Sequence, residues 1–237
     1  MTLDFILRMG NALIYLVLTI KLYQRYKESK EVLIKWFATF CFFMCLFQLS
    51  IGLPAYICIW LKRYTVLEKV IKYGFTVGHA LLAIGGAFLA LIPAHFLWPR
   101  FKKLHFATII ALGLIATVGN ILGAEGKYIQ DTVIAIFPRI NNILMPIFSF
   151  LGIGLAGIFL LIYAFKQDLD KKLRIRSVVM GGGITFANSL GPLHQIITTP
   201  IYWTLLDVGT LLGFTITAFA VFFIKPEERT IPRKFYK

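Results

Sequence analysis

Residues 202–224 read YWTLLDVGTLLGFTITAFAVFFI, and Asp207 is the one charged side chain in this stretch. A helix needs about 20 predominantly apolar residues to cross the hydrocarbon core of a bilayer, which is about 30 Å thick. The stretch therefore predicts a membrane-spanning helix. Its first half contains Thr204, Asp207 and Thr210, whereas its second half ends in the apolar run TAFAVFF. The polar groups of this helix are thus concentrated toward one side of the membrane.

Apolar stretches of similar length recur along the whole chain. Hydrophobic residues make up 58% of the sequence and the mean hydropathy is +0.77, above the roughly 45–50% apolar content of soluble domains. We expect spans at residues 3–22, 34–58, 70–97, 104–122, 141–164, 177–198 and 202–224. The sequence predicts an all-α polytopic membrane protein, a seven-transmembrane-helix bundle over residues 1–224, followed by a basic cytoplasmic tail at 225–237. No basic segment precedes the first span and no small-residue cleavage site follows it, so we expect a retained helix rather than a signal peptide.

The basic residues predict the orientation of this bundle in the plasma membrane. Cytoplasmic loops of membrane proteins carry an excess of Lys and Arg. With the N-terminus outside and the C-terminus cytoplasmic, eighteen of the 25 basic residues lie inside and seven outside. The inner ones are Lys21, Arg25, Lys27, Lys30, Lys35, Arg100, Lys102, Lys103, Lys166, Lys171, Lys172, Arg174, Arg176, Lys225, Arg229, Arg233, Lys234 and Lys237. Because the net charge of +14 is distributed over short segments between spans, we expect anionic lipid of the bilayer as its partner rather than nucleic acid.

With that orientation, the polar residues of the spans fall in their outer halves. We single out eight of them as candidates for binding a small ligand that enters from outside: Arg8, Asn11, Thr76, His79, Asn188, Gln195, Asp207 and Thr210. An ionisable side chain at the centre of a membrane helix costs at least about 2.5 kcal/mol on insertion scales, which makes each one a functional candidate. Two alternatives stay open: small and polar stripes also serve helix packing, and Arg8 could extend to the membrane surface.

The sixth predicted span contains GGGITFANSLGPLHQIITTP, residues 181–200. In a helix, Gly181, Thr185, Asn188, Pro192 and Gln195 would share one face, because they are separated by three or four positions. We expect this face to line the polar pocket, with Gly181–Gly183 and Pro192 permitting close packing or a kink.

The motifs argue against an enzyme and predict no metal site. The sequence contains no HExxH, phosphate-binding glycine loop or G-x-S-x-G motif. Retinal chemistry would need a lysine within the last helix, and residues 202–224 have none. No cofactor is predicted, but haem held by His79 and His194 remains an alternative. Against haem, helical phase turns His194 about 100° away from the polar face of its span.

Two further stretches carry a resemblance to a known family. They are IKWFATFCFFMCLFQLSIGLPAY, residues 34–56, and LLAIGGAFLALIPAHFLWPRFKKLHFATIIALGLIATVGN, residues 81–120. A basic loop, a Trp-Phe helix and a third helix ending in a short basic turn resemble the seven-transmembrane-helix sensor region of membrane histidine kinases. The resemblance implies a module that senses a ligand. Because few residues follow Phe223, it also implies an input module that needs a cytoplasmic or membrane signalling partner, or a relative that has lost signalling.

The pattern of polar residues therefore favours a receptor-like or sensor-like integral membrane protein whose pocket opens to the outside. Its ligand is not identified by the sequence. A small-solute transporter is the main alternative, because broken helices near the membrane midplane are typical of transporter substrate sites.

Overall fold

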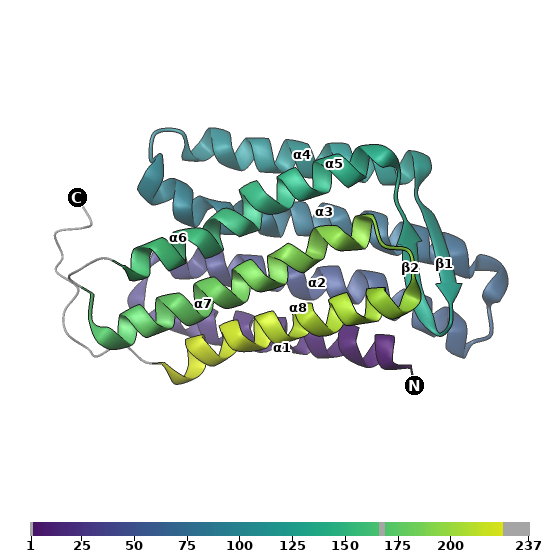
Figure 1. The fold of residues 1–237 in the computed structure, drawn as a ribbon, viewed down its shortest axis with the longest axis horizontal. Coiled ribbons are helices and arrows are strands. Elements are labelled where there is room, and N and C mark those ends of the chain that lie inside the picture. Colours follow the sequence, from purple (N-terminus) through teal and green to yellow (C-terminus); the bar gives the residue numbers. More distant parts are fainter. Residues whose placement is uncertain (1, 166–168, 225–237) are drawn as a thin grey trace.

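The computed structural model describes residues 2–165 and 169–224, which form a bundle of helices with one small β-hairpin (Figure 1). The helices are α1 (Leu3–Ser29), α2 (Val32–Trp60), α3 (Tyr64–Leu97), α4 (Lys102–Gly123), α5 (Arg139–Ser149), α6 (Leu155–Ala164), α7 (Lys171–Leu190) and α8 (Pro200–Phe223). A π-helical turn, Phe150–Gly154, joins α5 to α6, so these two helices form one continuous rod. The helical class that the sequence predicts is confirmed. The predicted tail at 225–237 lies outside the described residues.

Six of the rods are long and apolar enough to cross a membrane: α1, α2, α3, α4, the α5–α6 rod and α8. Helix α7 does not meet the same criterion within the described ranges, because its first turns carry Lys171, Lys172, Arg174 and Arg176. Its α-helix also ends at Leu190, whereas the predicted span ran to residue 198. The structure thus supports a multi-pass membrane bundle with six candidate spans in the described ranges, and the predicted span at residues 177–198 is not among them.

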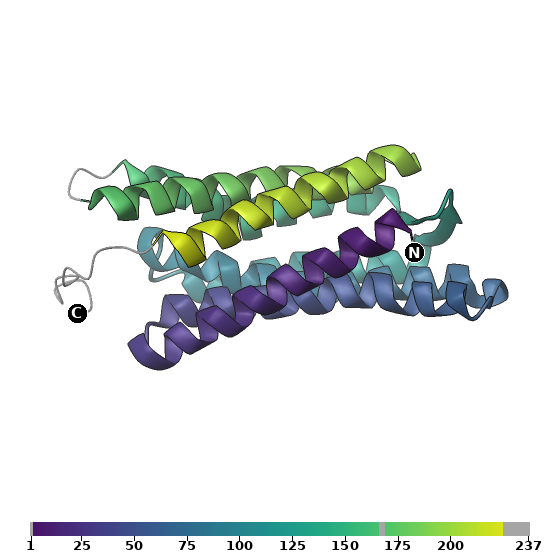
Figure 2. The same ribbon diagram turned by 90° about the horizontal axis from the view of Figure 1, so that it is seen from below.

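The rods lie side by side along the long axis of the molecule (Figure 2). Each helix contacts its neighbour in the chain, and α8 returns to contact α1, so that the rods close into a ring. Within this ring α3 also contacts α6. Buried aromatic and aliphatic side chains from α1, α2, α6, α7 and α8 form the main apolar core, including Tyr15, Phe40 and Phe214.

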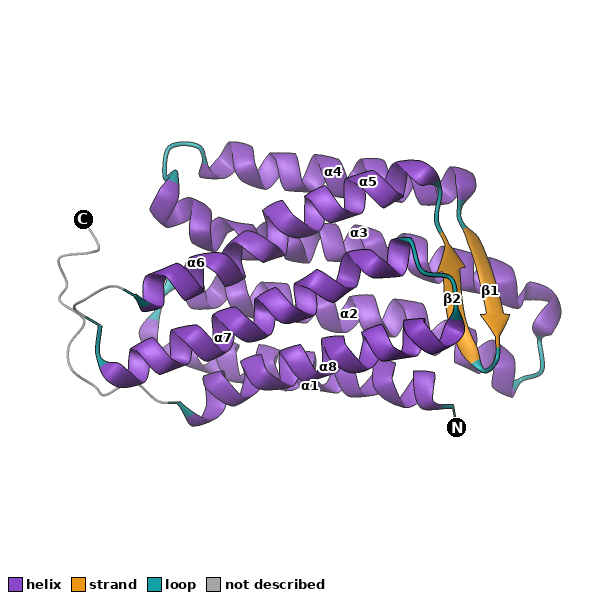
Figure 3. Ribbon diagram, in the orientation of Figure 1, coloured by secondary structure: helices purple, strands orange, loops and turns teal. Residues whose placement is uncertain are grey.

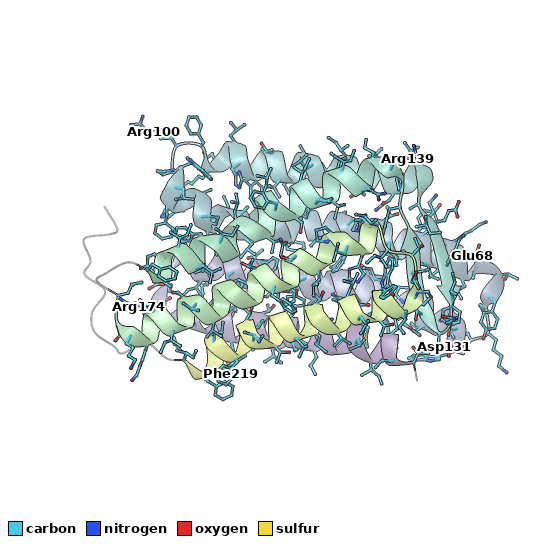
Figure 4. All side chains as sticks on the ribbon, viewed as in Figure 1. Glu68, Arg100, Asp131, Arg139, Arg174 and Phe219 are labelled. Carbon is cyan, nitrogen blue, oxygen red and sulfur yellow. The ribbon has the colours of Figure 1, made fainter. Side chains whose placement is uncertain are left out.

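The two ends of the bundle differ in architecture. One end, which we call the hairpin end, carries the N-terminus of α1, the α2–α3 turn, the hairpin and the α7–α8 connection (Figure 3). The opposite end carries the α1–α2 and α3–α4 turns. Exposed charged side chains are labelled at both ends in Figure 4: Glu68 and Asp131 at the hairpin end, Arg100 and Arg174 at the opposite end. Every candidate residue from the sequence except Asn11 and Thr76 lines one cavity in the hairpin half.

The hairpin is the main element that the sequence did not predict. Strand β1 (Glu125–Ile129) pairs antiparallel with β2 (Thr132–Ile136), with Glu125 opposite Ile136. The two turn residues, Gln130 and Asp131, have φ of 48° and 60°, which is typical of the type I′ turn that suits a two-residue hairpin. Residues 132–135 of β2 are buried. The segment 124–138 is therefore part of the folded core at this end rather than an open loop.

Two helical irregularities line the interior of the hairpin half. The π-turn after α5 adds a residue to one helical turn, and such turns are frequent at functional sites; Ile153 of this turn lines the cavity described below. At the end of α7, the helix tightens to a 3₁₀ turn over Gly191–Gln195, with Pro192 at its start, and His194 and Gln195 of this turn line the same cavity. Gly181–Gly183 stay helical, and Gly181 and Gly183 give close packing.

Candidate functional site

A cavity of about 110 Å³ lies among α1, α2, α3, α5, α7 and α8, in the half of the bundle nearer the hairpin. Its walls are largely aromatic and aliphatic, with side chains that include Phe47, Phe75, Phe137, Phe148, Trp203 and Phe214. Its polar lining residues are Arg8, Gln48, His79, Ser149, Asn188, His194, Gln195, Asp207 and Thr210. An apolar cavity with a few convergent polar groups is the usual form of a small-molecule site.

Six of the eight candidate residues line this cavity: Arg8, His79, Asn188, Gln195, Asp207 and Thr210. Asn11 and Thr76 are buried but are not among its lining residues. Thr76 Oγ1 donates a hydrogen bond to Lys72 O of its own helix, 2.9 Å away, so that its hydroxyl is satisfied locally. Sharing a helix face with a site residue therefore did not ensure a place in the cavity wall.

A chain of four charged or ionisable side chains reaches the wall: Arg8, Asp207 and His194 line the cavity, and Asp4 lies behind Arg8. Arg8 Nε donates to Asp4 Oδ2 at 3.1 Å, and Arg8 Nη2 lies 3.5 Å from Asp207 Oδ2. His194 Nε2 lies 3.3 Å from Asp207 Oδ1 on the other side. Arg8 is 3% exposed, so it is buried in the bundle and does not extend to the membrane surface.

The same arginine also holds the hairpin. Arg8 Nη2 donates to Val133 O at 2.9 Å, and Val133 N donates to Asp4 Oδ2 at 3.3 Å. Tyr56 OH donates to the same carboxylate oxygen at 2.6 Å. The Asp4–Arg8 pair thus connects α1 to α2 and β2, while Arg8 also reaches the cavity carboxylate of Asp207. Asp207 is therefore linked to the hairpin through a single side chain, that of Arg8.

The position of His194 corrects the helical-phase argument. In a continuous α-helix this side chain would point away from the polar face, but the 3₁₀ turn at Gly191–Gln195 has three residues per turn rather than 3.6. The imidazole therefore faces Asp207 and packs edge-on against Trp203, with ring centroids 4.9 Å apart. A change of helix type at Pro192 places it beside the carboxylate.

A second polar cluster borders the cavity on the side of α4 and α5. Asn120 Nδ2 contacts His79 Nδ1, and Asn141 Nδ2 donates both to Asn120 Oδ1 and to Ala116 O. The three side chains are at most 4% exposed, and they come from three helices. His79 also lies against the Phe137 ring, at a centroid distance of 5.0 Å. This cluster fixes α3, α4 and α5 relative to one another and orients the imidazole.

Several polar atoms in the cavity have no hydrogen-bond partner among the described residues. They are Gln195 Oε1, Trp203 Nε1, Thr210 Oγ1, His194 Nε2 and Asp207 Oδ2, all buried; the last two face charged partners at 3.3–3.5 Å without a hydrogen bond. An unsatisfied polar group is costly in a bundle surrounded by lipid, which favours an occupant that bonds to them. A dry apolar cavity of about 150 Å³ holds benzene, so this cavity suits a small molecule or a few waters.

The structure also bears on the histidines considered for haem. His79 contacts Asn120 and His194 faces Asp207, so each ring already has a protein partner. Within residues 2–165 and 169–224, no three His, Cys, Asp or Glu side chains converge in a way that could hold a metal ion. The haem alternative stays a prediction, and the absorption spectrum of the purified protein, with or without a Soret band, tests it.

Sequence reasoning missed several residues of the site. Gln48, Ser149 and Trp203 line the cavity but were not among the candidates. Ser149 Oγ donates to Asn188 Oδ1 at 2.6 Å, which connects the α5–α6 rod to α7. The depth of Gln48 in its span was a usable signal, whereas no sequence signal distinguishes Trp203 from a tryptophan at the membrane interface.

No protein-family model matches the chain, and no curated protein or solved structure is detectably similar to it. The function must therefore be inferred from the site itself.

Proposed function

We propose that the protein is a receptor-like or sensor-like membrane module that binds a small ligand in the cavity beside Arg8, His194 and Asp207. The observation that carries this proposal is the cavity itself, in which a buried charged cluster and unpaired hydrogen-bonding atoms face a common space. Gln195 Oε1, Trp203 Nε1 and Thr210 Oγ1 are unpaired and belong to residues that line this one cavity, beside the charged cluster.

The ligand would enter from the outside, with the hairpin end facing out of the cell. The distribution of Lys and Arg supports this orientation, because most basic residues lie in segments of the opposite end. The resemblance of residues 34–56 and 81–120 to the sensor region of membrane histidine kinases points to the same class of function, and a separate signalling partner would then be needed.

Arg8 provides a route from ligand to output. It contacts Asp207 in the cavity wall and Val133 O of the hairpin. A ligand that engages Asp207 weakens or strengthens the Arg8–Asp207 contact and so favours one of two hairpin positions. Such a shift requires the ligand to bind the two arrangements with different affinity.

The experiment that tests the proposal is a ligand screen by thermal unfolding, run on the unaltered protein and on Thr210→Leu. The larger apolar side chain fills part of the cavity and removes one unpaired hydroxyl, so a compound that binds there should lose its stabilising effect. Thr215→Leu is the matched control, because Thr215 lies on the same helix with an exposed side chain. Compounds that stabilise both variants equally would place binding outside the cavity.

One observation favours a transporter as the second candidate. Helix α7 ends beside the cavity in the 3₁₀ turn Gly191–Gln195, which is followed by a short connection to α8, and non-helical backbone that lines a cavity is typical of substrate sites in transporters. Saturable uptake by proteoliposomes would support this function and contradict the receptor proposal. The apolar side chains of the opposite half, such as those in TAFAVFF, argue against a polar exit path.

A further inference from the structure

The charged side chains at the cavity do not balance. Asp4 and Asp207 contribute two carboxylates, and Arg8 contributes one guanidinium that contacts both. The other ionisable groups facing this cluster are His194 beside Asp207, His79 across the cavity, and Tyr56, whose hydroxyl donates to Asp4. Within residues 2–165 and 169–224, no lysine and no second arginine lines the cavity. With both histidines neutral, the buried cluster carries a formal charge of −1.

An uncompensated charge inside a bundle is costly, and buried charges in proteins are paired or hydrogen-bonded. The missing positive charge can come from a proton on His194 or from the occupant of the cavity. Both would lie next to Asp207, whose Oδ2 makes no hydrogen bond although Arg8 Nη2 is 3.5 Å away. Asp4 Oδ1 also makes no hydrogen bond, but Asp4 Oδ2 accepts from Arg8 Nε, Tyr56 OH and Val133 N. Asp4 is thus the better satisfied carboxylate, and the deficit lies mainly on the Asp207 side of the cluster.

The rest of the wall suits a cation. Six aromatic rings line the cavity, from Phe47, Phe75, Phe137, Phe148, Trp203 and Phe214, and the faces of such rings attract ammonium groups. Arg8 itself lies over the Phe75 ring, 5.8 Å from its centroid. Gln195 Oε1 and Thr210 Oγ1 are unpaired acceptors for an N–H group. Trp203 Nε1 is an unpaired donor, which a hydroxyl of the ligand or a water would satisfy.

We infer that the cavity binds a small organic monocation of the ammonium class, with its nitrogen next to Asp207. This inference rests on the proposed ligand-binding function and adds the charge of the ligand. Since benzene needs about 150 Å³, a cavity of about 110 Å³ limits the buried part of the ligand to about five non-hydrogen atoms. An anion is excluded from this position by the existing negative charge.

The experiment uses the full chain purified in detergent and three probes of similar shape: isopropylammonium, isopropanol and isobutyrate. We expect only isopropylammonium to raise the unfolding temperature. Asp207→Asn should weaken its affinity by about 30-fold or more, as expected when a cation loses a buried carboxylate partner. Asp131→Asn is the control, because Asp131 is exposed at the hairpin tip.

The results of this experiment test the charge of the ligand separately from the binding function of the cavity. Stabilisation by isobutyrate or isopropanol that equals that of isopropylammonium would overturn the ligand charge and leave the cavity as a binding site. If none of the three probes stabilises the protein, both the charge and the binding function are wrong. The comparison of the three probes needs only the unaltered chain, so the inference is testable even if Asp207→Asn fails to fold.

Discussion

Arg8 is the residue on which the hairpin half of the bundle depends most. Its guanidinium is buried between Asp4 and Asp207 and donates to Val133 O. Its position in the first span, four residues after Asp4, marked it in the sequence as a possible member of an i,i+4 pair. Its contacts with the hairpin and with α8 could not be predicted, because they join segments more than 100 residues apart.

Replacing Arg8 by Gln should destabilise the protein strongly, because two buried carboxylates would lose their cation. Breaking a buried ion pair by removing one partner costs about 3–5 kcal/mol. Unfolding in detergent would measure the loss. Arg139→Gln is the matched control, since Arg139 is exposed, and its effect should stay within about 0.5 kcal/mol. Equal effects of the two substitutions would contradict the role assigned to Arg8.

The polar cluster of His79, Asn120 and Asn141 yields a second residue-scale prediction. Asn120→Ala removes the side chain that contacts both His79 and Asn141. Leaving buried polar groups unpaired costs about 1–3 kcal/mol. Asn142→Ala is the control, because the Asn142 side chain makes no hydrogen bond among the described residues. Chemical unfolding would compare the two variants. A cost for Asn120→Ala no greater than that for Asn142→Ala would show that the cluster does not hold α3, α4 and α5 together.

At the scale of elements, α7 is positioned by close contacts of its glycines. A Cβ atom added at Gly183 would lie 2.6 Å from Gly213 O of α8, whereas a Cβ added to its neighbour Gly182 would meet nothing within 4 Å. The helices therefore approach backbone to backbone at Gly183. The sequence indicated that the three glycines permit close packing, but it could not tell which of them faces a neighbouring helix.

This difference predicts opposite effects of the same substitution at two adjacent glycines. Gly183→Ala should destabilise the protein by about 1–3 kcal/mol, because overpacking forces the backbone apart. Gly182→Ala should stabilise it by about 0.5–1 kcal/mol, because alanine is the better helix former. Thermal unfolding of the two variants against the unaltered chain measures both signs. A stabilising Gly183→Ala would rule out the close α7–α8 contact.

The hairpin and the orientation of the 3₁₀ turn could not be predicted from the sequence pattern. The run TVIAI, residues 132–136, has the β-branched residues typical of a strand, but a short apolar run does not distinguish a strand from a loop or a buried helix segment. The 3₁₀ turn follows from Pro192, which the sequence marked as a break. Its consequence for His194 could not be predicted, because a helical-phase argument assumes an unbroken α-helix.

At the scale of the whole molecule, the length and composition of the apolar stretches predicted the helical bundle and most span boundaries within a few residues. Orientation is not fixed by the fold, so it needs its own test. In a background without Cys41, Cys45 and Cys58, Asp131→Cys should react with a membrane-impermeant maleimide added to intact cells. Arg100→Cys, at the opposite end (Figure 4), should react only after the membrane is opened. The reverse pattern would invert the proposed topology.

The separation of polar and apolar halves was also predictable, because it follows from the depth of each side chain in its span. The cavity between the helices was not, since its volume depends on the π-turn, the 3₁₀ turn and the hairpin together. These irregular elements are also those that bring side chains of α1, α7 and α8 to the same space.

The most direct test of the binding site is an experimental structure of the protein in a lipid phase, determined in the presence of isopropylammonium. We predict non-protein density within hydrogen-bond distance of Asp207 Oδ2, Gln195 Oε1 or Thr210 Oγ1. A cavity closed by hydrogen bonds among these three groups, or a structure in which Asp207 faces lipid, would contradict the site.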